Sequence, residues 1–201
     1  RLHQLIYNTM KLYLTLTVIF ICTLNTFIAQ NKSYEFESSK ENPFGKYNPK
    51  APKELQDYKD LIGVCNCTSE SRKPDGSWAK PVNMTWEWRY IMNGMAVQDL
   101  TLKKDNRHSG SIRQYDTIHK QWNVHYYAST STPKTLSSWT GNKTKEGKIV
   151  LYKKQKAPNG TEGFFRLSFY DISDKGYKWV GEWTDLNEKI VYPTWKINCT
   201  K

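Results

Sequence analysis

The chain has no second long hydrophobic run after its first thirty residues. Its apolar stretch from Leu12 to Ala29 is free of acidic residues, follows Met10 and Lys11, and ends at a small residue before polar sequence. That layout is typical of a secretory signal peptide, and the stretch is barely long enough to span a membrane. We therefore expect residues 1–29 to be upstream residues and a cleavable signal peptide. The remaining chain should be secreted or periplasmic, with no stable membrane span.

Motifs of several enzyme and binding classes are also missing. The sequence has no His-Glu-x-x-His, no Gly-x-Ser-x-Gly and no nucleotide-binding loop, which are the patterns of zinc proteases, α/β hydrolases and nucleotide-binding proteins. No histidine lies close in sequence to the cysteines of the mature chain, and the usual Cys-x-x-Cys spacing is absent. We therefore expect no metal and no cofactor.

Acidic residues are few relative to basic ones. The 19 Asp and Glu stand against 30 Lys and Arg, for a formal net charge of +11. Such a balance favours anionic partners in general. The basic residues are spread between the expected strands and turns, and no basic helix is present. We expect no nucleic-acid partner and retain an adhesive role at anionic surfaces as an alternative function.

Cysteine is scarce, which makes its pairing informative. Without residues 1–29, only Cys65, Cys67 and Cys199 remain. In an oxidising compartment these are disulfide candidates. The first two share one face of the first expected strand, and the third lies at the end of the last. If these two strands are antiparallel neighbours, Cys199 falls beside Cys65 or Cys67, and a bridge there would close the sheet into a barrel.

The residues that are abundant predict an antiparallel β-protein. Residues 30–51 are polar and predict a flexible tether, and residues 52–61 have the proline and apolar spacing of one short N-terminal helix. From Gly63 onward, short runs of β-branched and aromatic residues alternate with turn clusters. We therefore expect residues 52–201 to form one all-β domain, an antiparallel meander closed into a barrel.

Two hairpins can be assigned a register. Asn93-Gly94 predicts a tight turn because both positions tolerate positive φ. The pairs that it sets up are Tyr90 with Val97, Arg89 with Gln98 and Trp88 with Asp99, with Trp86, Trp88 and Tyr90 on one face. A turn centred on Asp174 pairs Phe165 with Trp183, Phe169 with Trp179 and Arg166 with Glu182. The first two of these pairs form an aromatic face and the third lies on the opposite, polar face.

Three segments in this order resemble a known family. They are Asn93-Gly94-Met95-Ala96-Val97-Gln98-Asp99; Gly110-Ser111-Ile112-Arg113-Gln114-Tyr115-Asp116 with Trp122 beyond; and Arg166 to Ile172 followed by Tyr177-Lys178-Trp179-Val180-Gly181-Glu182-Trp183. They are similar to a Gly-Arg-Ala-Val-Gln-Asp segment, a Leu-Arg-Phe-Tyr-Asp hairpin and the C-terminal signature of a bacterial secreted lipocalin-like (calycin) β-barrel family of unknown function. The resemblance spans residues 61–199. It implies a lipocalin-like barrel and no established activity. The Gly-x-Trp of lipocalins proper is replaced by Gly63-Val64-Cys65, so their ligands are not transferred.

A barrel of this size holds one small ligand or fills its interior with side chains. We expect an exported barrel that binds a small apolar or amphipathic molecule without turnover. The residues expected to bind it are Trp86, Trp88, Phe165, Phe169, Trp179, Trp183, Arg89 and Gln98. The alternative is a barrel enzyme of the lyase or isomerase type, in which Arg166 and Glu182 form an acid–base pair. If these polar residues face outward, they are exterior cross-strand pairs that contribute little.

Overall fold

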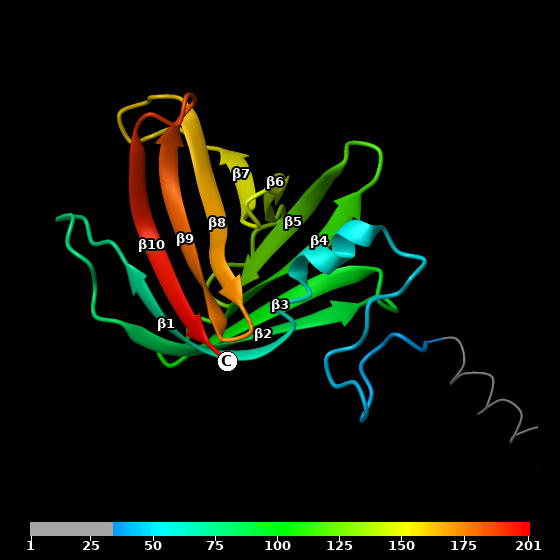
Figure 1. The fold of residues 1–201 in the computed structure, drawn as a ribbon. Helices are drawn as coiled ribbons and strands as arrows, with labels where there is room; N and C mark the ends of the chain where they lie inside the picture. Colours follow the sequence, from blue (N-terminus) through cyan, green and yellow to red (C-terminus); the bar gives the residue numbers. More distant parts are fainter. Residues whose placement is uncertain (1–33) are drawn as a thin grey trace, which may run out of the picture. The chain divides into compact units, whose positions relative to one another are not determined.

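Ten antiparallel strands close into a barrel in the computed structural model, which describes residues 34–201 (Figure 1). The strands are β1 (Gly63–Ser71), β2 (Val82–Ile91), β3 (Ala96–Lys103), β4 (Ser109–Asp116), β5 (Gln121–Ala128), β6 (Ser137–Lys143), β7 (Ile149–Lys154), β8 (Gly163–Ser173), β9 (Gly176–Asp185) and β10 (Val191–Thr200). Each strand pairs with the next along the chain, and β10 pairs with β1. The all-β meander and its closure are thereby confirmed. The expected signal peptide lies outside the described residues.

The first and last strands are joined by a disulfide bond. Their register places Cys67 directly opposite Cys199, and the two sulfurs are bonded across a sequence separation of 132 residues. Cys65 remains a buried free thiol. The predicted bridge is confirmed, and the register decides which of the two candidates forms it. Asn66 pairs with Thr200, which is the last residue of β10. Cys65 therefore lies past the end of β10 and has no position opposite Cys199.

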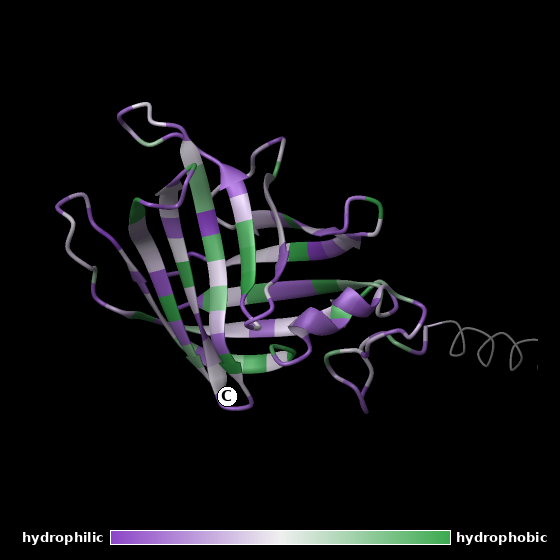
Figure 2. Ribbon diagram, turned by 45° about the horizontal axis from the view of Figure 1, so that its top comes forward, coloured by the Kyte–Doolittle hydropathy of each residue, from purple (hydrophilic) through white to green (hydrophobic). Residues whose placement is uncertain are grey.

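The core lies inside the barrel and follows from the alternation of the strands. Figure 2 shows hydrophobic and hydrophilic residues alternating along them. On β2, Met84, Trp86, Trp88 and Tyr90 are all buried, whereas the residues between them are not. Side chains two positions apart in a strand point to the same face, so each strand contributes one row of residues to the interior.

Both predicted hairpin registers are confirmed. On β2 and β3, Trp88 lies opposite Asp99 and Arg89 opposite Gln98, around a turn with positive φ at Met92, Asn93 and Gly94. On β8 and β9 the pairs are Phe165 with Trp183, Phe169 with Trp179 and Arg166 with Glu182. A bulge between Tyr170 and Ser173 lets a shorter turn replace the expected three-residue centre without changing these pairs.

The expected N-terminal helix is a short 3-10 helix, η1 (Lys53–Tyr58), rather than a longer helix over residues 52–61. Its Leu55 and Tyr58 side chains are completely buried, so packing into one end of the barrel holds it in place. Residues 34–201 contain no helix of the length and apolarity that a membrane span requires.

The segment before η1 contacts the barrel along much of its length. Residues 36–51 were expected to belong to a flexible tether. In the structure the Tyr90 backbone N–H donates a hydrogen bond to the Phe44 carbonyl at 2.9 Å. The Asn48 side-chain amide donates to the Asn93 carbonyl at 3.0 Å. Hydrogen bonds to the β2–β3 hairpin therefore hold this segment, and Tyr47 and Ala51 add apolar contacts with the core.

We predict that the disulfide contributes strongly to stability. In the chain-entropy model, a loop this long gives about 5 kcal/mol, and domains have a free energy of unfolding of only about 5–15 kcal/mol. The double variant Cys67→Ala/Cys199→Ala should therefore unfold at much lower urea concentration. Cys65→Ala is the control and should shift the urea midpoint far less. Equal shifts in the two variants would contradict a specific role for the bridge.

Candidate ligand-binding site

The barrel has two different ends. The first, which we call the helix end, is covered by η1, whose Tyr58 ring lies 5.5 Å from the Trp88 ring and 4.8 Å from that of Trp122. The other end carries the long connections between β1 and β2, β5 and β6, and β7 and β8. We call it the loop end. In a meander, successive connections lie at alternate ends of the barrel. The connections at the two ends therefore consist of different residues and have different lengths.

Aromatic side chains fill the interior toward the helix end. Trp88 and Phe169 are 0% exposed, and Trp86 and Trp179 are 4% and 5% exposed. The ring centroids of Trp86 and Trp88 lie 5.4 Å apart, and the Phe169 ring meets Trp88 edge-on at 5.5 Å. Four of the residues expected to bind a ligand therefore lie in the packed core of this structure, where they contact one another.

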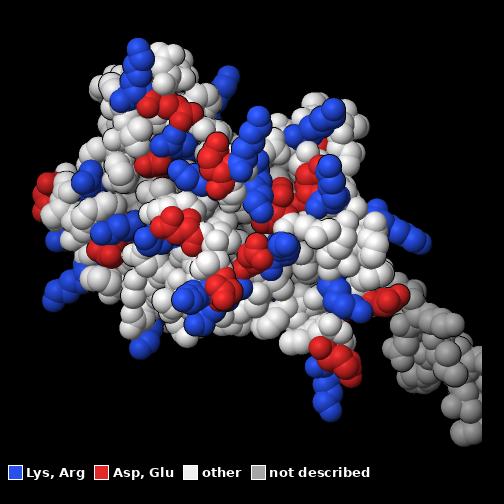
Figure 3. Space-filling view, viewed as in Figure 1, with Lys and Arg blue, Asp and Glu red and all other residues white. Residues whose placement is uncertain are grey.

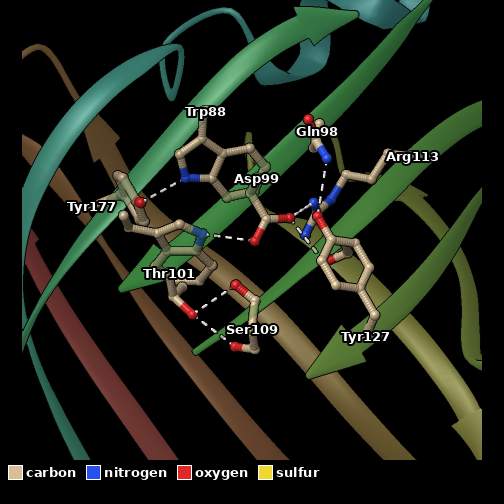
Figure 4. Close-up of polar contacts among 10 residues, drawn as sticks. Trp88, Gln98, Asp99, Thr101, Ser109, Arg113, Tyr127 and Tyr177 are labelled. Carbon is tan, nitrogen blue, oxygen red and sulfur yellow. Dashed lines mark hydrogen bonds and ion pairs between the residues drawn. The ribbon is translucent and has the colours of Figure 1, made fainter. Parts of the chain in front are cut away.

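A buried ion pair crosses this aromatic core. The Asp99 carboxylate on β3 pairs with the Arg113 guanidinium on β4 (Figure 4). It also accepts hydrogen bonds from the Trp86 indole N–H and the Ser111 hydroxyl, both at 2.8 Å. The Arg113 guanidinium lies 4.4 Å above the Trp88 ring. Three donors on one carboxylate offset the cost of removing its charge from water.

The electrostatics of the pair depend on burial and on the partner charge. Burial alone would lower the pKa of Arg113, but the adjacent Asp99 carboxylate and the Tyr58 side chain together outweigh it and hold that pKa above its ordinary value. Two further buried polar contacts lie near this pair. The Thr101 and Ser109 side-chain oxygens lie 2.7 Å apart (Figure 4). The Trp88 indole N–H donates to the Tyr177 hydroxyl at 2.8 Å. These polar groups bind one another, which makes the network a structural element of the barrel.

At the loop end, side chains that point inward remain accessible to solvent. Phe165 and Leu167 on β8 are only partly buried, although Phe169, further along the same face, is completely buried. The other residues of this kind are Tyr126 on β5, Trp183 on β9 and Trp195 on β10, and Trp139 on β6 lies beside them at 8% exposure. We call these six residues the loop-end wall. Inward-facing apolar side chains at this end, Leu167 included, are therefore partly exposed to solvent.

Hydrogen bonds fix the aromatic side chains of this wall. The Trp139 indole N–H donates to the Phe165 carbonyl at 3.1 Å, and that of Trp183 to the Gln155 carbonyl at 2.9 Å. The Trp195 indole N–H donates to the Ser69 hydroxyl at 2.8 Å. With their polar atoms bound, these indoles present apolar rings, which suits contact with an apolar molecule.

Glycine leaves space for two aromatic rings at one position of β9, beside the wall. A side-chain carbon built at Gly181 would lie 2.8 Å from the Trp179 ring and 3.2 Å from the Phe165 ring. The first distance is too short for two carbon atoms and the second is tight, so a residue larger than glycine would displace the Trp179 ring. Gly181 thus provides the space in which Trp179 and Phe165 pack over β9.

The predicted polar site residues face outward. Arg89 pairs with Glu87 on the outer face of β2, and the Gln98 amide donates to the Tyr127 hydroxyl at 3.0 Å. The strand alternation that turns Trp88 inward necessarily turns both Arg89 and Gln98 outward. A role in orienting a ligand inside the barrel would require a side chain that lines the interior. Neither Arg89 nor Gln98 does so.

Arg166 and Glu182 also lie on the outer face. The Arg166 Nε and Nη2 groups donate to one Glu182 oxygen at 3.0 and 2.8 Å, and Nη1 donates to Glu188. A shallow hollow of about 440 Å³ lies over this cluster and includes Tyr152. The pair is thus a largely buried ion pair outside the barrel. Residues 34–201 include no group of three or more His, Cys, Asp or Glu placed to hold a metal ion.

No protein-family model matches this chain, and comparison with the curated proteins finds no match.

We predict that Arg113 is one of the most costly residues to replace. Arg113→Met leaves the buried Asp99 charge without its cation, which should lower the free energy of unfolding by about 3–5 kcal/mol. Adding Asp99→Asn should restore part of this loss, because the unpaired charge is removed. Arg89→Met, in an exposed pair, should cost at most about 1 kcal/mol. Urea unfolding of these three variants and of Asp99→Asn alone measures the differences, and additive losses at positions 99 and 113 would contradict the coupling.

We also predict a loss of stability in alkali. Burial raises the pKa of both Tyr58 and Tyr90 to about 12, whereas an unfolded tyrosine ionises near pH 10. From about pH 10 to 12 the unfolded chain loses protons that the folded chain retains. The contribution of these two tyrosines to the free energy of unfolding is therefore fully present below pH 10. Above pH 10 the free energy of unfolding falls by about 1.4 kcal/mol per pH unit for each of them. Tyr58→Phe should reduce this slope. Urea midpoints between pH 9 and 11.5 test it, and an unchanged slope in the variant would refute it.

Proposed function

We propose that this protein binds a small apolar or amphipathic molecule at the loop-end wall, without turnover. The observation that supports this most is the partial exposure of inward-facing Phe165, Leu167 and Trp183. Apolar side chains of a folded barrel normally bury each other, as Trp88 and Phe169 do at the helix end. An apolar molecule placed against the wall would remove this surface from water, at about 25 cal/mol per Å².

The residues that we propose contact the ligand are only in part those expected from the sequence. Phe165 and Trp183 belong to the wall, and Trp86, Trp88, Phe169 and Trp179 form the floor beneath it. A packed floor favours a preformed site, since little has to move when a ligand binds. Export is part of the proposal, and the Cys67–Cys199 disulfide supports it because such bonds persist in oxidising compartments.

The two alternatives receive less support. In the enzyme alternative, Arg166 must act on a substrate, but its donors are engaged by Glu182 and Glu188. In the adhesive alternative, cationic residues should gather on one surface. Figure 3 shows Lys and Arg interspersed with Asp and Glu over the face viewed, which weakens the potential of any one patch.

A variant that fills the wall tests the proposal. Leu167→Trp adds bulk at an inward, partly exposed position, whereas Phe164→Trp adds it at an outward position of the same strand, three residues away. We expect the fluorescent probe N-phenyl-1-naphthylamine to bind the wild type, and Leu167→Trp to weaken binding about tenfold with little loss of stability. Phe164→Trp should bind the probe like the wild type. No binding to the wild type, or equal effects of the two variants, would contradict a site on this wall.

A further inference from the structure

We propose that the ligand is an amphipathic anion and that Lys153 binds its charged group. The inference rests on the proposed function and specifies the class of ligand. By anion we mean a carboxylate, sulfate or phosphate carried on an apolar body. Two features of the loop-end wall lead to it: the position of the Lys153 side chain, and the absence of a carboxylate beside it.

Lys153 points into the barrel from β7. It lies opposite inward-facing Phe165 and two residues from completely buried Leu151. Its ammonium group lies 5.0 Å from the centroid of the Trp139 ring and donates a hydrogen bond to the Ser137 hydroxyl at 3.1 Å. Trp139 and Phe165 both belong to the loop-end wall, so the positive charge lies directly beside the apolar surface proposed to contact the ligand.

This charge has no acidic partner. Within residues 34–201 the contacts of the Lys153 ammonium are Ser137 and Trp139, and no carboxylate pairs with it. Lys103 is the informative comparison, because it also faces inward and lies over a wall residue, Trp195, at 5.7 Å. Its ammonium is 3.5 Å from the Asp105 carboxylate. Of these two inward lysines, only Lys153 is available to an external anion.

The surrounding groups suit an anion with more than one oxygen. Lys153 offers its remaining N–H donors, and the Ser137 hydroxyl can donate while its oxygen accepts from Lys153. Hydrogen bonds to charged groups are stronger than neutral ones, and the adjacent rings reduce competition from water. Leu167 lies one row deeper than Phe165 on the same face of β8. The anionic group would therefore lie near the rim, with the apolar body extending past Phe165 toward Leu167.

The test compares a charged ligand with its neutral ester in three variants. Dodecanoate and methyl dodecanoate are titrated to displace N-phenyl-1-naphthylamine from the full chain. Lys153→Met retains the apolar stem and removes the charge, and Lys153→Arg retains the charge. Lys154→Met is the matched control, because the next residue along β7 is exposed and points outward. Circular dichroism and urea midpoints verify folding.

We expect the wild type to bind dodecanoate at least about tenfold more tightly than its ester. Lys153→Met should remove that preference while leaving ester binding unchanged, and Lys153→Arg and Lys154→Met should keep it. Equal binding of acid and ester to the wild type would overturn the inference and leave the proposed function standing. Equal losses in Lys153→Met and Lys154→Met would also overturn it, since they indicate a general effect of net charge. If neither ligand nor the probe binds, the proposed function fails with it.

Discussion

The pairing of β1 with β10 is the constraint on which the rest of this structure depends. Ten strands in a meander have two unpaired edges until the first and last strands meet, and here the Cys67–Cys199 bond holds them together. Closure also separates an inside from an outside. Every side chain then belongs to the core, the wall or the surface according to its position in the alternation, and Trp88 and Arg89 are assigned opposite roles although they are neighbours in sequence.

The interior is divided along the axis of the barrel. Toward the helix end it is packed with rings and crossed by the Asp99–Arg113 pair, which stacks on Trp88. A pair with this degree of burial costs desolvation and constrains geometry, so it fixes how the aromatic floor is arranged. Toward the loop end the same faces of the strands continue with Phe165, Leu167 and other residues that solvent reaches. The loop-end wall, where we propose that a ligand binds, therefore lies over a packed aromatic floor.

The elements that local sequence specifies were predicted well. Asn93-Gly94 determined the β2–β3 register, because the turn type and the hydrophobic alternation agree. At the β8–β9 hairpin the aromatic pairs were predicted correctly even though the turn is shorter than expected, since the bulge after Tyr170 compensates. Contacts along residues 36–51 were not predicted. They rest on hydrogen bonds to the β2–β3 hairpin and on packing of Tyr47 and Ala51 against the core, which the polar composition of that segment does not reveal.

The choice between Cys65 and Cys67 and the buried ion pair required long-range register. Cys65 and Cys67 share a face, and only the offset of β1 against β10 distinguishes them. Asp99 had a detectable signal, because an acidic residue opposite inward Trp88 must find a buried partner. That partner, Arg113, comes from another strand, and its position depends on the β3–β4 pairing. Arg89 and Gln98 were placed in the site by residue type, although their alternation with Trp88 already turned them outward.

Fluorine NMR of the protein labelled with 5-fluorotryptophan tests the central claim most directly, with resonances assigned by single Trp→Phe variants. Titration with dodecanoate should shift the signals of Trp139, Trp183 and Trp195, which belong to the loop-end wall. The signals of Trp88 and Trp122, which are 0% exposed, should change far less. A response confined to Trp78, whose ring lies beside the Arg72 guanidinium outside the wall, or no response at any tryptophan, would contradict binding at the wall.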